Sequence, residues 1–103
     1  MKITRSADCK NSPKNAFVEE LVIGLFTGAN LATHLQDGAA LPGVPEGVSA
    51  VDITHAISHG KIGAANGTMT VGGVQQPFAI FIEFSSTKAT LVKSLSLYSI
   101  TSK

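Results

Sequence analysis

The sequence is short of several residue types that would mark particular classes of protein. Of its 103 residues none is tryptophan, one is cysteine and only 15% are charged. The single cysteine, Cys9, excludes an internal disulfide. The net charge is +1 and the basic residues are scattered, which argues against a nucleic-acid partner. Apolar runs such as 21–26, interrupted by Gly24, are too short to cross a bilayer, so we expect no membrane partner.

Motifs that bind common cofactors or direct secretion are also missing. The segment 60–63 lacks the first glycine and the hydroxyl of a phosphate loop, and we find no dinucleotide fingerprint or nucleophile elbow. No apolar stretch follows residues 1–6, so we expect no secretory signal and a cytoplasmic protein. Apolar residues make up 44% of the chain, enough for the core of one domain over residues 1–103. We expect no cofactor.

The N-terminal part of the chain has clear helix signals. Ser12 can cap a helix with its hydroxyl, and Pro13 suits the first helical position because no amide donor is needed there. Apolar residues then recur at three- and four-residue spacing, and Gly28 is a natural terminator. The pattern predicts a helix over Pro13–Thr27.

A second, shorter helix is expected to follow, over 31–36 with Asn30 as its cap. The segment 39–50 contains two prolines and two glycines, which predicts an irregular surface loop.

From residue 51 the hydrophobic period changes to two, which is typical of strands. Glycine-containing turns at 60–61 and 72–73 would join the first three strands. An alternative turn at Asn66-Gly67 leaves two very short strands and ranks second. The pattern therefore predicts an antiparallel meander with strands over 51–59, 62–71, 77–84 and 90–100.

Pairing these strands assigns the side chains to two faces of a sheet. His55 falls opposite Asn66, Asn66 opposite Ala79, and Phe81 opposite Ser94. One face mixes apolar, small and hydrogen-bonding side chains: Ile53, His55, Ile57, Ala64, Asn66, Thr68, Ala79, Phe81, Ser94, Ser96 and Tyr98. The other face is strongly apolar: Ala65, Met69, Phe78, Ile80, Ile82, Phe84, Leu91, Leu95 and Leu97.

The apolar face is too hydrophobic to meet water, because exposed patches of this size usually mark interfaces. We therefore expect a homodimer, with the helices over the mixed face, where small side chains leave a cavity. The dimer interface would be formed by Phe78, Ile80, Leu95 and Leu97.

Two segments carry a family resemblance. Residues 9–20, CKNSPKNAFVEE, and residues 55–68, HAISHGKIGAANGT, resemble two signatures of a bacterial group of nuclear transport factor 2-like (SnoaL-like) proteins. The resemblance implies a cystatin-like cone of curved antiparallel sheet around helices, usually dimeric, with a pocket inside. Family members include ketosteroid isomerase and polyketide cyclase relatives and many proteins without a known activity, so the fold alone says little about chemistry.

The sequence departs from the family pattern after the second expected helix. Family members usually have an extra strand, often with a tryptophan, and a third helix in this region. Here only residues 39–50 fill the space and tryptophan is absent, which indicates an internal deletion of something like twenty residues. The deletion removes part of the expected pocket wall.

Few residues are candidates for chemistry. His55 and Asn66 could hydrogen-bond each other and point into a pocket, where His55 could act as an acid or a base, or they could simply satisfy each other as buried polar groups. Glu83 is the other candidate base, although a rim carboxylate that reaches water is more common. His55 and His59 lie about 13 Å apart along a strand, too far to share a metal ion, and His34 has no evident partner, so we expect no metal site.

The sequence thus predicts an α+β fold, two N-terminal helices packed on a curved four-stranded antiparallel β-meander, a shortened nuclear transport factor 2-like cone. The first functional hypothesis is a dimeric module that binds a small apolar or mixed ligand between helices and sheet, lined by His55, Asn66, Phe81 and Tyr98. The alternatives are an isomerase- or cyclase-like enzyme with His55 or Glu83 as base, and a structural dimer without a pocket.

Overall fold

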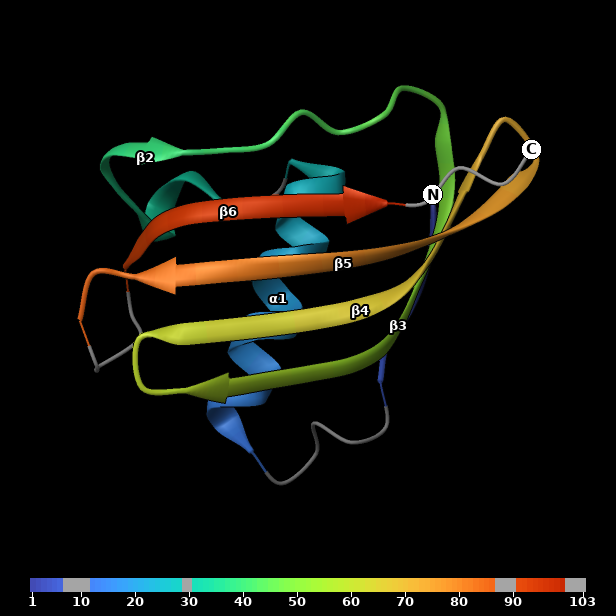
Figure 1. Cartoon of the computed structure of the whole chain (residues 1–103). Coiled ribbons are helices and arrows are strands. Elements are labelled where there is room, and N and C mark those ends of the chain that lie inside the picture. Colours follow the sequence, from blue (N-terminus) through green and yellow to red (C-terminus); the bar gives the residue numbers. More distant parts are fainter. Residues whose placement is uncertain (7–11, 29–30, 87–90, 100–103) are drawn as a thin grey trace.

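The computed structural model describes residues 1–6, 12–28, 31–86 and 91–99 (Figure 1). One α-helix, one 3-10 helix and six strands follow in the order β1 (Lys2–Thr4), α1 (Pro13–Thr27), η2 (Ala32–His34), β2 (Leu35–Ala40), β3 (Val48–His59), β4 (Ile62–Val71), β5 (Val74–Phe84) and β6 (Val92–Ser99).

The strands form one six-stranded mixed sheet in the order β1-β3-β4-β5-β6-β2 (Figure 1). Strands β3 to β6 pair antiparallel, whereas β1 runs parallel to β3 and β2 runs parallel to β6. The prediction of two helices on a four-stranded antiparallel meander is therefore wrong, although the class remains α+β. The meander lies in the middle, and two short parallel strands extend it on both sides.

Helix α1 begins and ends where its sequence signals place it. The Ser12 hydroxyl accepts a hydrogen bond from the backbone N–H of Asn15 at 3.3 Å, and Pro13 occupies the first turn. At the other end Gly28 adopts a left-handed conformation with φ of 78° and donates its N–H to the Gly24 carbonyl. These caps confirm the predicted helix Pro13–Thr27.

The second predicted helix is wrong. Only Ala32–His34 form a 3-10 turn, and Leu35 turns extended, with φ of −95° and ψ of 134°, to begin β2. Six residues are too few to offset the cost of helix nucleation, whereas an extended chain can pair with β6 and pack Leu35 against the core. The proposed cap Asn30 lies outside the described residues.

The expected loop over 39–50 is shorter than predicted. Strand β2 extends to Ala40, and β3 already begins at Val48. The irregular link therefore consists of residues 41–47, which hold both prolines of this region.

The central hairpins have the predicted turns. Gly60 and Gly72-Gly73 adopt positive φ at the two turns, and His55 lies opposite Asn66, which excludes the alternative turn at Asn66-Gly67. In the last hairpin Phe81 lies opposite Ser96 rather than Ser94, and a register irregularity lies between Glu83 and Phe84. A shift of two residues leaves Ser94, Leu95, Ser96, Leu97 and Tyr98 on their expected faces, whereas Leu91, expected on the apolar face, is 44% exposed and Val92 is buried in its place.

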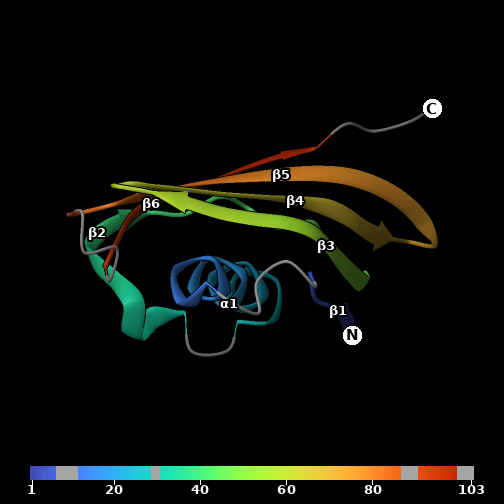
Figure 2. The ribbon, with the colours of Figure 1, turned by 90° about the horizontal axis from the view of Figure 1, so that it is seen from below.

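Helix α1 covers the apolar face of the sheet, and no other helix or strand of the described residues lies over the opposite face (Figure 2). Val18, Leu21 and Val22 of the helix are buried in one cluster with apolar strand residues, among them Ile53, Met69, Phe78, Ile80, Ile82, Phe84 and Leu95. Placing the helices over the mixed face was therefore wrong. Burying the more apolar face removes more hydrocarbon from water, and this outweighs any preference for a cavity.

A bulge in β3 separates two residues that were predicted to share a face. The β3–β4 register shifts between Ile53 and His55, so Ile53 is buried in the core whereas His55 is exposed on the other side. Gly67 lies opposite the bulge, and a Cβ atom there would come within 2.0 Å of the Asp52 carbonyl oxygen. Only glycine permits this approach of the two backbones.

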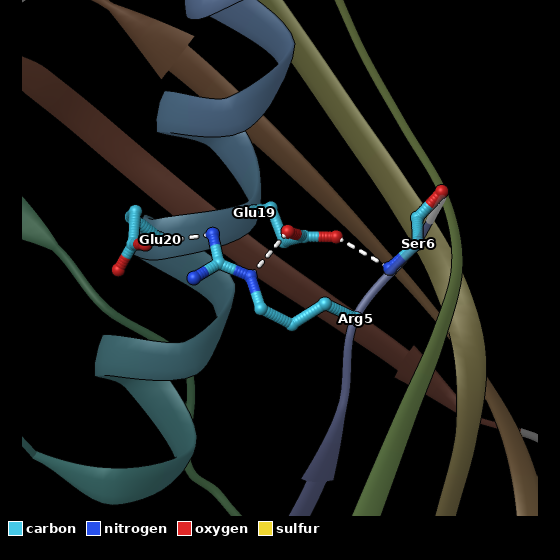
Figure 3. Close-up of polar contacts among 4 residues, drawn as sticks. All are labelled: Arg5, Ser6, Glu19 and Glu20. Atoms are coloured by element: carbon cyan, nitrogen blue, oxygen red, sulfur yellow. Dashed lines mark hydrogen bonds and ion pairs between the residues drawn. The ribbon is translucent and has the colours of Figure 1, made fainter. Parts of the chain in front are cut away.

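A buried carboxylate ties the N-terminal segment to α1 (Figure 3). Glu19 is only 1% exposed; it accepts hydrogen bonds from Arg5 Nε at 2.6 Å and from the Ser6 backbone N–H at 2.7 Å. Arg5 also pairs with the exposed Glu20. The hydrogen bond to Glu19 raises the pKa of Arg5, opposed in part by desolvation, so the cation persists at every ordinary pH.

Candidate functional site

The side of β3–β6 that faces away from α1 is here named the open face. Two rows of side chains cross its middle, and we name them the central rows. The first consists of Ile57, Ala64, Phe81 and Ser96; the second consists of His55, Asn66, Ala79 and Tyr98.

Large apolar side chains stand out from these rows. Ile57 is 59% exposed, Phe81 52% and Tyr98 58%, and the rings of Phe81 and Tyr98 meet edge to face with centroids 6.1 Å apart. Small side chains lie between them, since both rows carry an alanine at a central position. The alternation of large and small side chains gives the open face its relief.

A depression of about 380 Å³ occupies the open face. Ala64 and Ala79 leave its centre low, while Ile57 and Phe81 rise at its sides and His55 and Asn66 supply the polar groups. The complete lining consists of His55, Ile57, Ala64, Ala65, Asn66, Ala79, Ile80 and Phe81.

A second depression, of about 250 Å³, adjoins the first. Asn66 and Ala79 line both, and Tyr98 lines only the second. The four residues predicted to contact a ligand, His55, Asn66, Phe81 and Tyr98, therefore lie together in space. They lie on the open face rather than between helix and sheet. Whether they bind a ligand stays a prediction.

The residues predicted to form a dimer interface lie on the covered side. Phe78, Ile80 and Leu95 are buried against the chain's own core, and Leu97 packs against the same cluster half-buried. Phe78 meets Phe26 of α1 edge to face, with ring centroids 5.3 Å apart. Phe78, Ile80 and Leu95 therefore have almost no surface left with which to contact a second copy.

The two candidate bases have different surroundings. His55 lines the depression. Glu83 lies on the open face as predicted but not in the lining; its carboxylate lies 3.8 Å from Lys93 Nζ and accepts a hydrogen bond from Ser94 at 3.5 Å. The two candidates therefore do not form one catalytic group.

In the described part of the chain, no three His, Cys, Asp or Glu side chains gather closely enough to hold a metal ion. His34 packs edge to face on Phe17, with centroids 4.9 Å apart, beside a separate depression of about 540 Å³ against α1. Cys9 lies outside the described residues.

Sequence reasoning placed Ile57, Ala64 and Ala79 on the mixed face but did not name them as site residues. Their signal was the alternation of small and large side chains at paired positions, which only a correct register makes visible.

No family model, curated protein or solved structure matches this chain. Among the described residues, no helix is long and apolar enough to cross a membrane.

Proposed function

We propose that this protein binds a small, largely apolar ligand on its open face. The observation that carries the proposal is the 380 Å³ depression, whose lining is mostly apolar with His55 and Asn66 as its polar side chains. Ligand sites typically have volumes of about 300–1,000 Å³, apolar walls and a few polar groups that fix orientation.

The lining indicates the shape of ligand that would fit. Ala64 and Ala79 form a low floor, and Ile57 and Phe81 rise from the same row on either side of Ala64. A flat hydrocarbon or aromatic group would contact the floor with one surface and the side walls with its edges. Such contacts remove apolar area from water without requiring a charged group on the ligand.

The polar groups lie in the other central row. An Asn amide both donates and accepts hydrogen bonds, and a neutral His ring does the same through its two nitrogens. Asn66 lies opposite His55 on one side and Ala79 on the other, so a polar atom of the ligand near the row can reach either group. We therefore expect a ligand with one or two polar atoms.

Membership of the nuclear transport factor 2-like family stays a prediction that rests on the segments 9–20 and 55–68. The homodimer stays a prediction as well. We do not extend the proposal to catalysis, because no observation favours it: Glu83 lies apart from the depression and binds Lys93.

The first test is a titration of nitrogen-labelled protein with anilinonaphthalene sulfonate, a probe of apolar sites. We expect amide shifts to concentrate at His55, Asn66 and Phe81, including the side-chain amide of Asn66. Shifts concentrated instead at Phe17 and His34, beside the 540 Å³ depression, would contradict the proposal, as would no saturable binding.

The matched variants are Ala64→Leu and Ala40→Leu. The first fills the floor of the depression and should weaken probe binding at least about tenfold, a loss of roughly 1.4 kcal/mol. The second adds the same group to exposed β2, away from the depression, and should leave the affinity unchanged. Equal affinities in the two variants would count against this location.

A further inference from the structure

The open face is a large sheet surface without a cover among the described residues. Helix α1 packs on the opposite side (Figure 2). Three large side chains of the central rows, Ile57, Phe81 and Tyr98, are each more than half exposed. Protein domains normally bury such a face against a second layer. The described residues form one layer of helix and one layer of sheet, and they leave the second side of the sheet without a cover.

The size of this face suits a stable interface. The molecule is a slab with extents of 39 × 31 × 22 Å, and the sheet forms one of its two broad sides. A standard interface buries about 800 Å² on each partner, which is less than the area of this side.

The charge distribution also suits an interface between identical molecules. The central rows contain no Asp, Glu, Lys or Arg. Charged groups of this face lie in the flanking rows: Asp52 on one side, and the Glu83–Lys93 pair on the other. A neutral centre with a charged rim is the usual anatomy of an interface, and a net charge of +1 gives little repulsion between two copies.

We infer that a second copy of this chain packs its open face on the open face of the first. The 380 Å³ depression of one copy then faces the same depression of the other, and together they form one enclosed chamber. Two sheets pack about 10 Å apart, and an isologous contact uses the same patch on both molecules. Phe81 and Tyr98 hold the sheets apart above the low floor at Ala64 and Ala79, so the contact leaves a chamber there. This inference rests on the proposed function, because the chamber is the proposed ligand site in its closed form.

The second copy encloses the site, which is open to solvent in a single chain. The depression is open to solvent, whereas ligand pockets typically enclose about 70–90% of the ligand surface. Two facing depressions have a combined volume of roughly twice 380 Å³, which remains within the range of ligand sites. The chamber then has a floor from one copy and a roof from the other.

The closing experiment begins with sedimentation of the wild type, Phe81→Lys and Val74→Lys. Phe81 and Val74 are each about half exposed in the single chain, but Val74 lies beside the Gly72-Gly73 turn, outside the central rows. We expect a wild-type dimer, a dimer for Val74→Lys, and self-association at least about thirtyfold weaker for Phe81→Lys. Ile57→Lys should behave like Phe81→Lys, and circular dichroism checks that each variant folds. A monomeric wild type, or a Phe81→Lys or Ile57→Lys dimer of wild-type strength, would overturn the inference.

Tyr98 reports directly on the open face, because the chain has no tryptophan and one tyrosine. Acrylamide should quench Tyr98 fluorescence less as protein concentration rises through the dimerisation range, and anilinonaphthalene sulfonate should shift that range to lower concentration. Unchanged quenching across the range would overturn the inference. A monomeric variant that binds the probe as tightly as the wild type overturns the shared chamber but not the proposed function. A dimer that binds no probe overturns both.

Discussion

The two faces of this sheet differ in composition although they alternate along the same strands. On β5, Ile80 is completely buried beneath α1 while its neighbour Phe81 is 52% exposed on the open face. The covered face is largely apolar, although the Ser58 hydroxyl donates a hydrogen bond to Asn15 of α1, whereas the open face mixes apolar, small and hydrogen-bonding groups. The difference teaches that the helix packs on the face with more hydrocarbon, and that polar groups such as His55 and Asn66 lie on the other face.

The difference between the faces depends on the bulge in β3, and replacing Gly67 by Ala should have the largest effect. The new Cβ would meet the Asp52 carbonyl oxygen at 2.0 Å and the Ile53 Cα at 3.0 Å, and both are backbone atoms that cannot rotate away. We expect a loss of about 4 kcal/mol in the free energy of unfolding, measured by urea denaturation, or failure to fold.

Gly43→Ala is the control for this substitution. A Cβ at Gly43 meets nothing within 4 Å, and its φ is not positive, so stability should change by less than about 0.5 kcal/mol. If Gly67→Ala lowered the free energy of unfolding as little as Gly43→Ala, the bulge would not bring the two backbones as close as described.

The second prediction compares neighbours on one strand. Ile80→Ala removes a completely buried side chain and should cost about 3 kcal/mol, whereas Phe81→Ala removes a larger but exposed one and should cost less than about 1 kcal/mol. Both are measured by thermal or urea unfolding at low protein concentration, where self-association does not contribute. Equal losses of unfolding free energy would mean that α1 does not bury the face of Ile80 in preference to the face of Phe81.

Much of the central architecture was predictable because its signals are local. The hydroxyl of Ser12, the ring of Pro13 and the left-handed conformation of Gly28 fix helix α1 without reference to the rest of the fold. The turns of the meander depend in the same way on glycine. Correct turns gave the pairing of His55 with Asn66, and hence the cluster of candidate site residues.

The remaining features depend on distant partners. Strand β1 has three residues, too few to show a period, and it exists through its parallel pairing with β3. Strand β2 contacts β6 across an irregular register, and Gly38 within it adopts positive φ, so its sequence lacks a strand pattern. The bulge between Ile53 and His55 reverses the alternation without any sequence signal except Gly67 on the neighbouring strand.

The choice of covered face was mistaken for a different reason. The sequence placed most side chains on the correct face, with Ile53 and Leu91 among the exceptions, but more weight was given to the cavity that small side chains leave than to the hydrocarbon that the helix could bury. An apolar face needs a cover, and the nearest one is the chain's own helix. The predicted interface residues Phe78, Ile80 and Leu95 became core residues as a result.

The smallest predicted effect concerns the contact that holds α1 to the N-terminal segment. Arg5→Ala removes the hydrogen bond and the ion pair that Arg5 makes with the buried Glu19 carboxylate, whereas the Ser6 N–H still donates to it. Because the Arg5 side chain is 47% exposed and screened by water, we expect a loss of about 1 kcal/mol rather than that of a fully buried pair. Glu20→Gln removes only the exposed partner and should cost less than about 0.5 kcal/mol.

The contribution of Arg5 to stability can also be measured as a function of pH, with the wild type and Arg5→Ala. Glu19 raises the pKa of Arg5 on folding, so the stability that this shift contributes is present in full below the ordinary arginine pKa and declines only as pH rises through the raised value. The difference in unfolding free energy between wild type and Arg5→Ala should therefore stay constant from neutral to moderately alkaline pH. A decline within that range would mean that a titrating group other than Arg5 contributes to the contact between the N-terminal segment and α1.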